Sequence, residues 1–375
     1  MSYNKKKVLF IIESLSGGGA EKVLTTLVRN INQEKYNVTV CSIVNTGEYI
    51  CEVKSCVNYK YILNKTNTLF GKVKYKLVYN ILPLKLVYLL FVPKRNDIEV
   101  AFIEGFSTKL LSHSTNRHSK KIAWVHIDLM INHWTDLVYH SREEEIRAYQ
   151  KFDKIICVSK SVKDSMSEFC KGFDNIGVLY NPIDSDEILN LSGKNCERSH
   201  FLTGNINLIS IGRLVHQKGY DRLIPILKRL HDEGYDFVLN ILGEGPDHSK
   251  LNRMIEENNM QKYISLMGFC PNPYPYLKVS DLFICSSRSE GYSTAVTEAL
   301  ILGVPVITTN CSGMNELLQD GQYGLITSNS EEALYEGIKQ LLSSNELEYY
   351  SKKAEERGKE FSIERIMQLI EFVLS

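Results

Sequence analysis

Apolar residues follow two alternating patterns along this chain. Short uninterrupted apolar runs, typical of strands buried on both faces, alternate with stretches in which apolar residues recur at helical spacing. The first run, Val8–Ile12, leads through three glycines into a helical pattern over residues 23–31 and then into a second apolar run, Val38–Ile43. This order of strand, glycine turn, helix and strand predicts a βαβ unit.

The same alternation continues over most of the chain. Further strands are expected at Glu99–Ile103, Lys121–His126, Lys154–Val158, Asn207–Ile211, Phe237–Leu242, Ile264–Met267, Leu282–Cys285 and Val304–Thr308. Strands that alternate with helices form parallel sheets. The chain is therefore predicted to be an α/β protein with a doubly wound, Rossmann-like parallel sheet in each half.

Length and polarity predict two domains. The chain has 375 residues, and a domain commonly has ~100–200. A polar stretch over residues 185–205 is the expected linker between a first domain over residues 1–184 and a second over residues 206–360. A C-terminal helix over residues 361–375 is expected to pack back on the first domain.

Charge is distributed unevenly although the formal net charge is zero. Residues 1–184 contain 26 Lys and Arg against 18 Asp and Glu, a net of +8, so the remainder carries −8. Residues 53–96 contain nine cations and no anion, together with many aromatic and aliphatic residues. This composition is typical of an amphipathic element at an anionic membrane surface, and it also fits an ordinary helix pair with a solvated lysine face.

The cysteines and the N-terminal residues indicate the cellular compartment in which the protein is expected. The nine cysteines form no Cys-x-x-Cys pair, and several lie in apolar runs, which indicates free thiols in a reducing cytoplasm. Only five apolar residues follow Lys5–Lys7 before Glu13, so no secretory leader is expected, and no apolar stretch reaches ~18 residues. The expected location is cytoplasmic, peripheral at the inner face of the cell membrane.

Candidate chemistry lies in the loops that follow the strands, because ligands of open α/β sheets bind beyond the carboxyl ends of the strands. Gly18 and Gly19 follow the first strand and can present amides at a helix N-terminus to a phosphate or a sugar hydroxyl. In the second half, Arg213 and Lys218 follow the first strand, five residues apart, and can clamp a diphosphate. Each feature alone also fits an ordinary turn.

The segment over residues 286–300 is the most specific. Glu290 is expected in the loop after a buried strand, and Gly291, Tyr292 and Ser293 then open a helix whose amides suit an anion. Glu298 falls among small and apolar residues of that helix, where a carboxylate requires a partner such as the hydroxyls of a ribose.

These motifs together resemble glycosyltransferase family 4, a family of retaining enzymes with the GT-B fold. The resemblance rests on Arg213, Lys218, the Glu290 and Glu298 pair, and the strand that begins Gly303-Val304-Pro305. Supporting matches are the early Gly-Gly-Ala-Glu, residues 178–184 and residues 242–246, and the chief departure is Asn181-Pro182, where many members have Asn-Gly. The similarity is strongest over residues 207–327 and looser over residues 1–184.

The resemblance implies two lobes that face each other across a cleft, with the first domain on the acceptor side and the second binding a nucleotide-sugar. Arg213 and Lys218 would neutralise the leaving diphosphate, Glu290 would bind the donor sugar and Glu298 the ribose. The matching positions also imply that Gly18 and Gly19 approach the diphosphate from the opposite lobe and that the amides of residues 291–293 hold the phosphate or sugar. They further imply that Gly268 and Phe269 line the nucleobase pocket and that His126 touches the donor sugar.

The implied activity is that of a retaining, metal-independent hexosyltransferase without a cofactor. It would use a nucleotide-sugar, most commonly a UDP-sugar, and extend a glycan, lipid-linked in keeping with the basic segment, for a surface polysaccharide such as capsule or lipopolysaccharide. No nucleic-acid partner is expected. Asp184-Ser185-Asp186 is a literal Asp-x-Asp, but it lies at the start of the expected linker, away from the phosphate loops, so no metal site is expected. Two alternatives remain open: a nucleotide-sugar epimerase of the same two-lobed fold, and a non-catalytic partner subunit of another glycosyltransferase.

Overall fold

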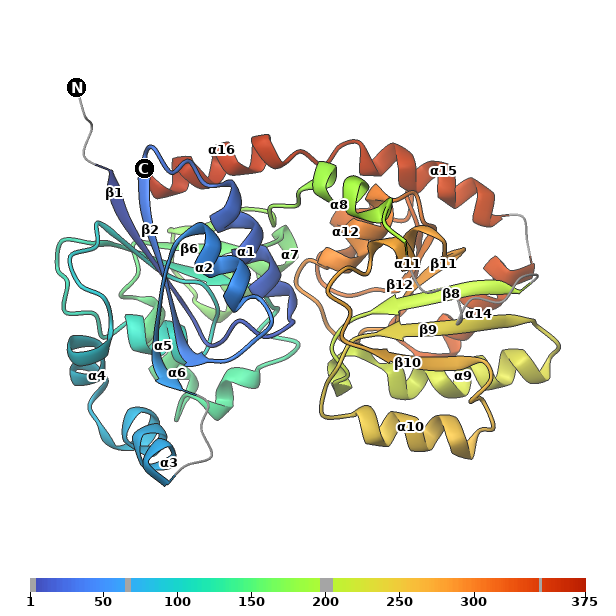
Figure 1. Ribbon diagram of the computed structural model, residues 1–375, viewed down its shortest axis with the longest axis horizontal. Coiled ribbons are helices and arrows are strands. Elements are labelled where there is room, and N and C mark those ends of the chain that lie inside the picture. The colour runs from blue at the N-terminus through green and yellow to red at the C-terminus, as the bar shows by residue number, and fades with distance from the viewer. Residues whose placement is uncertain (1–4, 65–68, 196–204, 344–345) are drawn as a thin grey trace. The chain divides into compact units, whose positions relative to one another are not determined.

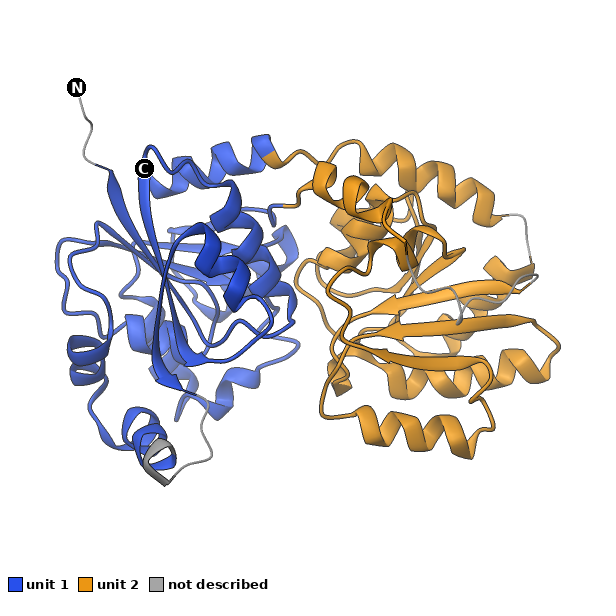
Figure 2. Cartoon of the chain, viewed as in Figure 1, with its two compact units in different colours: residues 1–182, 364–375 blue, residues 183–363 orange. Residues whose placement is uncertain are grey.

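The computed structural model describes residues 5–64, 69–195, 205–343 and 346–375. The chain divides into two compact units, which are coloured separately in Figure 2. Unit 1 consists of residues 1–182 and 364–375, and unit 2 of residues 183–363. No helix within the described ranges has the length and apolar character needed to cross a membrane.

Unit 1 contains a seven-stranded parallel sheet in the order β3-β2-β1-β4-β5-β6-β7. Its strands are β1 (Lys6–Ile12), β2 (Tyr36–Asn45), β3 (Asn58–Asn64), β4 (Ile98–Ala101), β5 (Lys120–Val125), β6 (Lys154–Cys157) and β7 (Ile176–Val178). The strand order reverses between β1 and β4, as in Rossmann-type sheets. The run Val8–Ile12 is fully buried at the centre of the sheet, in agreement with its uninterrupted apolar pattern.

The helices of unit 1 connect these strands and cover the sheet. They are α1 (Gly19–Asn30), α2 (Ile50–Cys56), α3 (Leu69–Lys76), the π-helix η1 (Leu77–Ile81), α4 (Leu84–Phe91), α5 (Phe106–Leu111), the 3-10 helix η2 (Trp134–Leu137), α6 (Arg142–Tyr149), α7 (Lys160–Phe169) and the C-terminal α16 (Ile363–Leu374). Helix α16 is held at the amino ends of the strands by hydrogen bonds. The Tyr36 hydroxyl, at the start of β2, donates to the Glu371 carbonyl at 3.1 Å, and the Lys120 Nζ, at the start of β5, donates to the Val373 carbonyl at 2.9 Å. The carboxyl ends of the strands are therefore left to the loops.

Unit 2 contains a six-stranded parallel sheet in the order β10-β9-β8-β11-β12-β13. Its strands are β8 (Ile206–Ile211), β9 (Phe237–Leu242), β10 (Ile264–Gly268), β11 (Leu282–Cys285), β12 (Val306–Thr309) and β13 (Leu325–Thr327). Its helices are α8 (Ser185–Ser192), the 3-10 helix η3 (His216–Lys218), α9 (Tyr220–Asp232), α10 (His248–Glu257), α11 (Tyr274–Lys278), α12 (Thr294–Ile301), α13 (Met314–Leu318), α14 (Glu331–Ser343) and α15 (Glu346–Gly358).

Two apolar cores enclose the sheet of unit 2, one on each face. One core joins the sheet to α9, α10 and α14, and the other joins it to α12, α13 and α15. Figure 1 shows α9 and α10 on one side of the sheet and α12 on the other. The prediction of two doubly wound parallel sheets is thereby confirmed.

Some details of the sequence prediction differ from the structure. Strands β3, β7 and β13 were not predicted. Part of the predicted linker is helix α8, which packs on α11 and α12, so the boundary between the units falls after Pro182. Asp184 of the literal Asp-x-Asp caps α8: its carboxylate accepts the Glu187 N–H at 3.0 Å. Residues 196–204 of the predicted linker lie outside the described residues.

Candidate active site

The candidate site of unit 2 lies where the strand order of its sheet reverses. β8 pairs with β9 on one side and with β11 on the other. The loops after β8 and β11 therefore leave the same edge of the sheet in opposite directions, which is where doubly wound sheets bind their ligands. Arg213 and Lys218 lie in the first loop, and Glu290 lies in the second.

Lys218 and Glu290 form an ion pair, although 72 residues separate them in sequence. The Lys218 Nζ lies 2.6 Å from the Glu290 Oε1, and the side chains are only 22% and 9% exposed. The Ser287 hydroxyl donates to the same carboxylate oxygen at 2.5 Å. Burial by itself lowers the pKa of Lys218, but the adjacent Glu290 charge outweighs burial and raises it above its usual value. Lys218 is therefore a fixed, fully charged cation.

Arg213 differs from Lys218 in being exposed. Its side chain makes no hydrogen bond or ion pair with any other residue in the described ranges. Its backbone is nevertheless held, because the Gly212 and Leu214 N–H groups donate to the Leu242 and Glu244 carbonyls at 3.0 and 2.9 Å. A free guanidinium on a fixed backbone can bind an anionic ligand without first breaking another contact.

Gly219 brings the two loops into contact. Its φ is +70°, and a Cβ there would lie 2.1 Å from the Ser286 carbonyl oxygen. The Ser286 hydroxyl also donates to the Lys218 carbonyl at 2.8 Å. No side chain fits between these backbones, so glycine at position 219 sets the close approach that joins Lys218 to Glu290.

The loop after Glu290 leads into α12. Ser293 is the N-cap of this helix, and its hydroxyl accepts the Val296 N–H at 3.4 Å. Gly313, which the sequence analysis did not single out, has a φ of +79°, and a Cβ there would lie 2.3 Å from the Gly291 carbonyl oxygen. Gly313 thus lets a second loop, after β12, support the turn at Gly291 and Tyr292.

The remaining predicted residues of unit 2 lie around this centre. Glu298 is on α12 and only 2% exposed, so its carboxylate is held within the unit. Gly268 ends β10 with a φ of +74° and forms a backbone bridge with Gly243. Phe269 follows it, partly exposed, and its N–H donates to the exposed Glu244 carboxylate at 3.5 Å.

The glycine loop of unit 1 carries a carboxylate of its own. Gly18 is the N-cap of α1, and Gly19 is the first residue of that helix. The Glu21 side chain folds back over Gly18, so that a Cβ on Gly18 would lie 2.3 Å from the Glu21 Oε2. A carboxylate at this point favours a hydroxyl donor as the contact rather than a phosphate.

His126 directly follows β5, as predicted, and is uncharged. Burial lowers its pKa to about 3, although a hydrogen bond to the Phe102 carbonyl opposes the shift. Its Nε2 is buried and has no partner among the described residues. Its backbone N–H donates to the Glu104 Oε2 at 3.1 Å, and burial raises the pKa of Glu104 to about 7. Glu104 was missed in the sequence, where a lone glutamate after β4 gives no signal.

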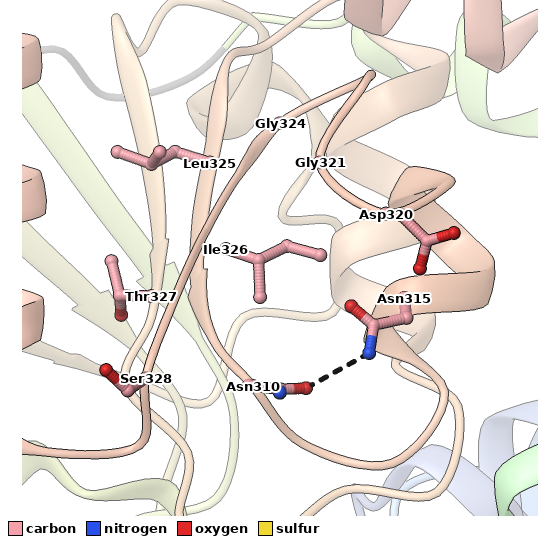
Figure 3. A pocket seen from close by; sticks show the side chains of 9 residues that line it. All are labelled: Asn310, Asn315, Asp320, Gly321, Gly324, Leu325, Ile326, Thr327 and Ser328. Carbon is pink, nitrogen blue, oxygen red and sulfur yellow. Dashed lines mark hydrogen bonds between the residues drawn. The ribbon is translucent and has the colours of Figure 1, made fainter.

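A separate hollow of about 480 Å³ lies beside the carboxyl ends of β12 and β13 (Figure 3). Asn310, Asn315 and Thr327 are among its lining residues, and Asn315 donates to Asn310 at 3.3 Å. It contains none of the predicted site residues. No cluster of three or more histidines, cysteines, aspartates or glutamates suited to a metal ion occurs in the part of the chain that is described.

Two family models match the chain, and each covers one half of it. The model described as Glycosyltransferase Family 4 matches residues 17–187, and the model described as Glycosyl transferases group 1 matches residues 195–360. The first match lies almost wholly within unit 1 and the second lies within unit 2.

Two relatives with described activities illustrate the similarity. The chain is 28% identical over 370 residues to N-acetylgalactosamine-N,N'-diacetylbacillosaminyl-diphospho-undecaprenol 4-alpha-N-acetylgalactosaminyltransferase of Campylobacter jejuni, with 95% of this chain and 96% of that protein covered. It is 25% identical to poly(ribitol-phosphate) alpha-N-acetylglucosaminyltransferase of Staphylococcus aureus, over 82% of this chain and 60% of that protein.

Solved structures share the fold at lower identity. HepE of Anabaena, in complex with UDP and glucose, aligns with a TM-score of 0.79 at 17% identity, over 98% of this chain and 99% of that chain. A TarM variant of Staphylococcus aureus in a complex that includes UDP aligns with a TM-score of 0.72 at 15% identity, over 97% and 98%.

Proposed function

Since this chain belongs to the group 1 glycosyl transferases, with a first half of the family 4 type, we propose that it is a retaining enzyme that uses a UDP-sugar to extend a lipid-linked glycan. Its activity as a glycosyltransferase of glycan biosynthesis follows from the family. Beyond the family's activity, we propose the identity of the donor, the retention of configuration and the lipid-linked acceptor. The observation that carries it is the buried Lys218–Glu290 pair beside the free guanidinium of Arg213.

The proposed chemistry needs no nucleophile from the protein. The bond between the sugar C1 and the diphosphate oxygen breaks, the acceptor oxygen bonds to C1 on the same face, and the acceptor proton passes to the departing diphosphate. Arg213 and Lys218 stabilise the negative charge that develops on the diphosphate, which is the largest contribution a fixed site can make. The Glu290 carboxylate, oriented by Ser287, accepts a hydrogen bond from a sugar hydroxyl.

The other predicted residues complete this assignment. Glu298 accepts hydrogen bonds from the ribose, Gly268 and Phe269 line the base, and amides of residues 291–293 contact phosphate or sugar. In unit 1, Gly18 and Gly19 are proposed to contact a hydroxyl group rather than the diphosphate, because the Glu21 carboxylate lies over Gly18, and the neutral His126 is proposed to contact a sugar.

Relatives support the donor and the stereochemistry. UDP is present in the HepE and TarM structures, and both named relatives form α-linked products. Common UDP-sugars are α-linked, so an α-linked product means retention of configuration. For the acceptor, the Campylobacter relative is named for a diphospho-undecaprenol glycan. A surface polysaccharide such as capsule or lipopolysaccharide is the proposed pathway.

The donor is tested by thermal unfolding of the purified protein with UDP-, GDP- and ADP-sugars. A ligand at 100 times its Kd stabilises the native state by about 2.7 kcal/mol, so the cognate nucleotide is expected to raise Tm by several degrees. Incubation of that donor with a diphospholipid-linked glycan, followed by NMR of the product's anomeric coupling, tests retention. An altered sugar in the donor alone would indicate an epimerase, and a protein that binds no nucleotide would contradict the proposal.

Activity is expected to survive removal of divalent metal ions. The charges that a metal ion would supply at the diphosphate are provided by Arg213 and Lys218, and Asp184 of the Asp-x-Asp is used to cap α8. Transfer should proceed at an unchanged rate in excess EDTA. Loss of activity in EDTA with recovery on addition of Mg²⁺ or Mn²⁺ would show that a metal takes part.

The segment that contains α3, η1 and α4 is proposed to bind the membrane surface. Its exposed apolar residues are Val73, Tyr75, Ile81, Leu86, Leu89 and Leu90, and the lysines at 72, 76 and 85 are exposed between them. Lys74 is half-buried and donates to the Ile62 carbonyl, so it contributes less. The first part of the basic segment consists of the end of α2 and the sheet strand β3, and the proposed interfacial element is therefore shorter than the segment predicted from the sequence.

Binding to anionic vesicles is expected to depend on these lysines. Each cation near such a surface contributes about 1 kcal/mol, so the triple change of Lys72, Lys76 and Lys85 to Gln should weaken co-sedimentation by roughly a hundredfold. High salt should weaken binding of the natural protein, because the Debye length falls to about 3 Å at 1 M.

The matched control changes Lys151, Lys171 and Lys262 to Gln, which removes the same charge from exposed positions elsewhere. This control should bind as the natural protein does. Equal weakening by both triple variants would assign the effect to net charge alone, and an absence of binding at low salt would contradict the membrane proposal.

A further inference from the structure

Arg222, in the first turn of α9, has a guanidinium that is buried against the loop of Glu290. Only 5% of the residue is exposed. Its Nε and Nη2 donate to the Ser286 carbonyl at 2.9 and 2.7 Å, and Nη2 also donates to the Ser287 carbonyl at 2.7 Å. Burying an arginine is costly, so three hydrogen bonds to main-chain carbonyls indicate that the side chain fixes this backbone.

The residues bonded to Arg222 adjoin the ion pair on both sides. Ser287, whose carbonyl Arg222 binds, donates its hydroxyl to Glu290. Lys218 lies four residues before Arg222, and its carbonyl accepts the Ser286 hydroxyl. A closed chain of contacts therefore runs from Lys218 through α9 and Arg222 to Ser287, then to Glu290 and back to Lys218.

A second pair of contacts supports the same junction from outside. Arg288 donates to the Asp221 carboxylate at 2.6 and 3.2 Å and to the His216 carbonyl at 2.7 Å. The Asp221 and Arg288 side chains are 18% and 29% exposed. The Ser287 carbonyl has other donors, the Thr309 hydroxyl at 2.5 Å and the Cys311 thiol at 3.1 Å. Of these three donors to the Ser287 carbonyl, Arg222 is the one that also binds the preceding carbonyl, that of Ser286.

We infer that Arg222 is a positioning residue that holds the Glu290 loop in register with Lys218, so that the sugar contact and the diphosphate contact act at a fixed separation. The inference rests on the proposed function for the roles of Lys218 and Glu290. Arg222 touches neither the donor nor the reacting atoms in this scheme. Its loss should therefore affect the alignment needed for transfer more than the affinity for the nucleotide.

The test compares Arg222→Leu, Arg222→Lys and the control Arg229→Leu. Arg229 lies on the same helix, but it is 49% exposed and contacts Glu332. Arg222→Leu is expected to lower kcat on the order of a hundredfold, because a displacement of about 1 Å has that effect on an aligned site. The Kd for UDP should change less than about threefold, and R222K, which can still donate to one carbonyl, should recover part of the rate.

A measurement that needs no activity follows the loop itself. Cys285 is the last residue of β11 and is 6% exposed. Its Sγ lies 4.0 Å from the Glu290 Oε1. Short treatment with iodoacetamide and mass spectrometry of the peptide should show several-fold faster labelling of Cys285 in Arg222→Leu than in the natural protein or the control. If R222L does not fold, the same measurements on R222K decide the inference.

A folded R222L (R222K if R222L does not fold) with natural kcat and natural Cys285 labelling would overturn the inference. So would a fall in kcat that is matched by an equal loss of UDP affinity, because that pattern means a direct role in donor binding. Failure of the proposed function would look different: the natural protein would transfer no sugar, while the effect of Arg222 on Cys285 labelling would still be measurable.

Discussion

Replacing Lys218 by methionine is expected to reduce sugar transfer on the order of a thousandfold, since the substitution removes two things at once. It removes a cation proposed to stabilise the leaving diphosphate. It also leaves the carboxylate of Glu290, whose side chain is 9% exposed, without the ion partner that holds it in place. Methionine keeps the length and apolar volume of the lysine stem, so the change tests charge rather than packing.

The double variant Lys218→Met/Glu290→Gln separates these effects. Breaking one side of a buried pair is destabilising because it leaves an uncompensated charge, whereas replacing both partners removes that charge. The single variant should therefore unfold at a lower Tm than the double variant, while both remain inactive. Equal Tm values for the single and double variants, or natural turnover in either, would contradict the paired role of Lys218 and Glu290.

Much of the fold could be predicted from the sequence because its strands are buried on both faces. The apolar run Val8–Ile12 falls within β1, and Phe237–Leu242 and Leu282–Cys285 coincide with β9 and β11. Strand β3 escaped notice because it lies at the sheet edge and most of its residues are polar or exposed. Strand β13 has three residues, too few to show a pattern.

For the candidate site, the sequence predicted which loops carry the candidate residues but not which of those residues contact one another. Arg213, Lys218 and Glu290 became candidates because they follow strands expected in parallel sheets and because their motifs together resemble glycosyltransferase family 4. The direct pairing of Lys218 with Glu290 could not be predicted, because it depends on β8 and β11 being neighbours, and sequence patterns do not give strand order. Arg222 carries no signal in the sequence, since only the tertiary structure brings the Ser286 carbonyl to the first turn of α9.

Substitution of Arg213 by alanine is expected to lower kcat/KM a hundredfold or more without a change in stability. The side chain is exposed and makes no hydrogen bond or ion pair with any other residue in the described ranges. Its removal therefore leaves no hydrogen-bonding group or charge without its partner in the unliganded protein. Tm in the absence of ligand should stay within about one degree, because surface changes of this kind are usually within ±0.5 kcal/mol. The loss should appear only when a diphosphate is bound, since loss of one electrostatic contact to a leaving group commonly costs a factor of 10²–10³.

Comparing the binding of UDP and UMP shows whether Arg213 contacts the second phosphate of the nucleotide. UDP should bind Arg213→Ala more weakly than it binds the natural protein, whereas UMP, which lacks the second phosphate, should bind both proteins with similar affinity. Arg213→Lys keeps the charge but loses the bidentate geometry of the guanidinium, so its turnover should lie between those of the natural protein and the alanine variant. Arg253→Ala, which removes an exposed arginine from α10, is the matched control and should change none of these quantities. Equal weakening of UMP and UDP would place Arg213 away from the leaving phosphate, and natural turnover in Arg213→Ala would exclude it from the reaction.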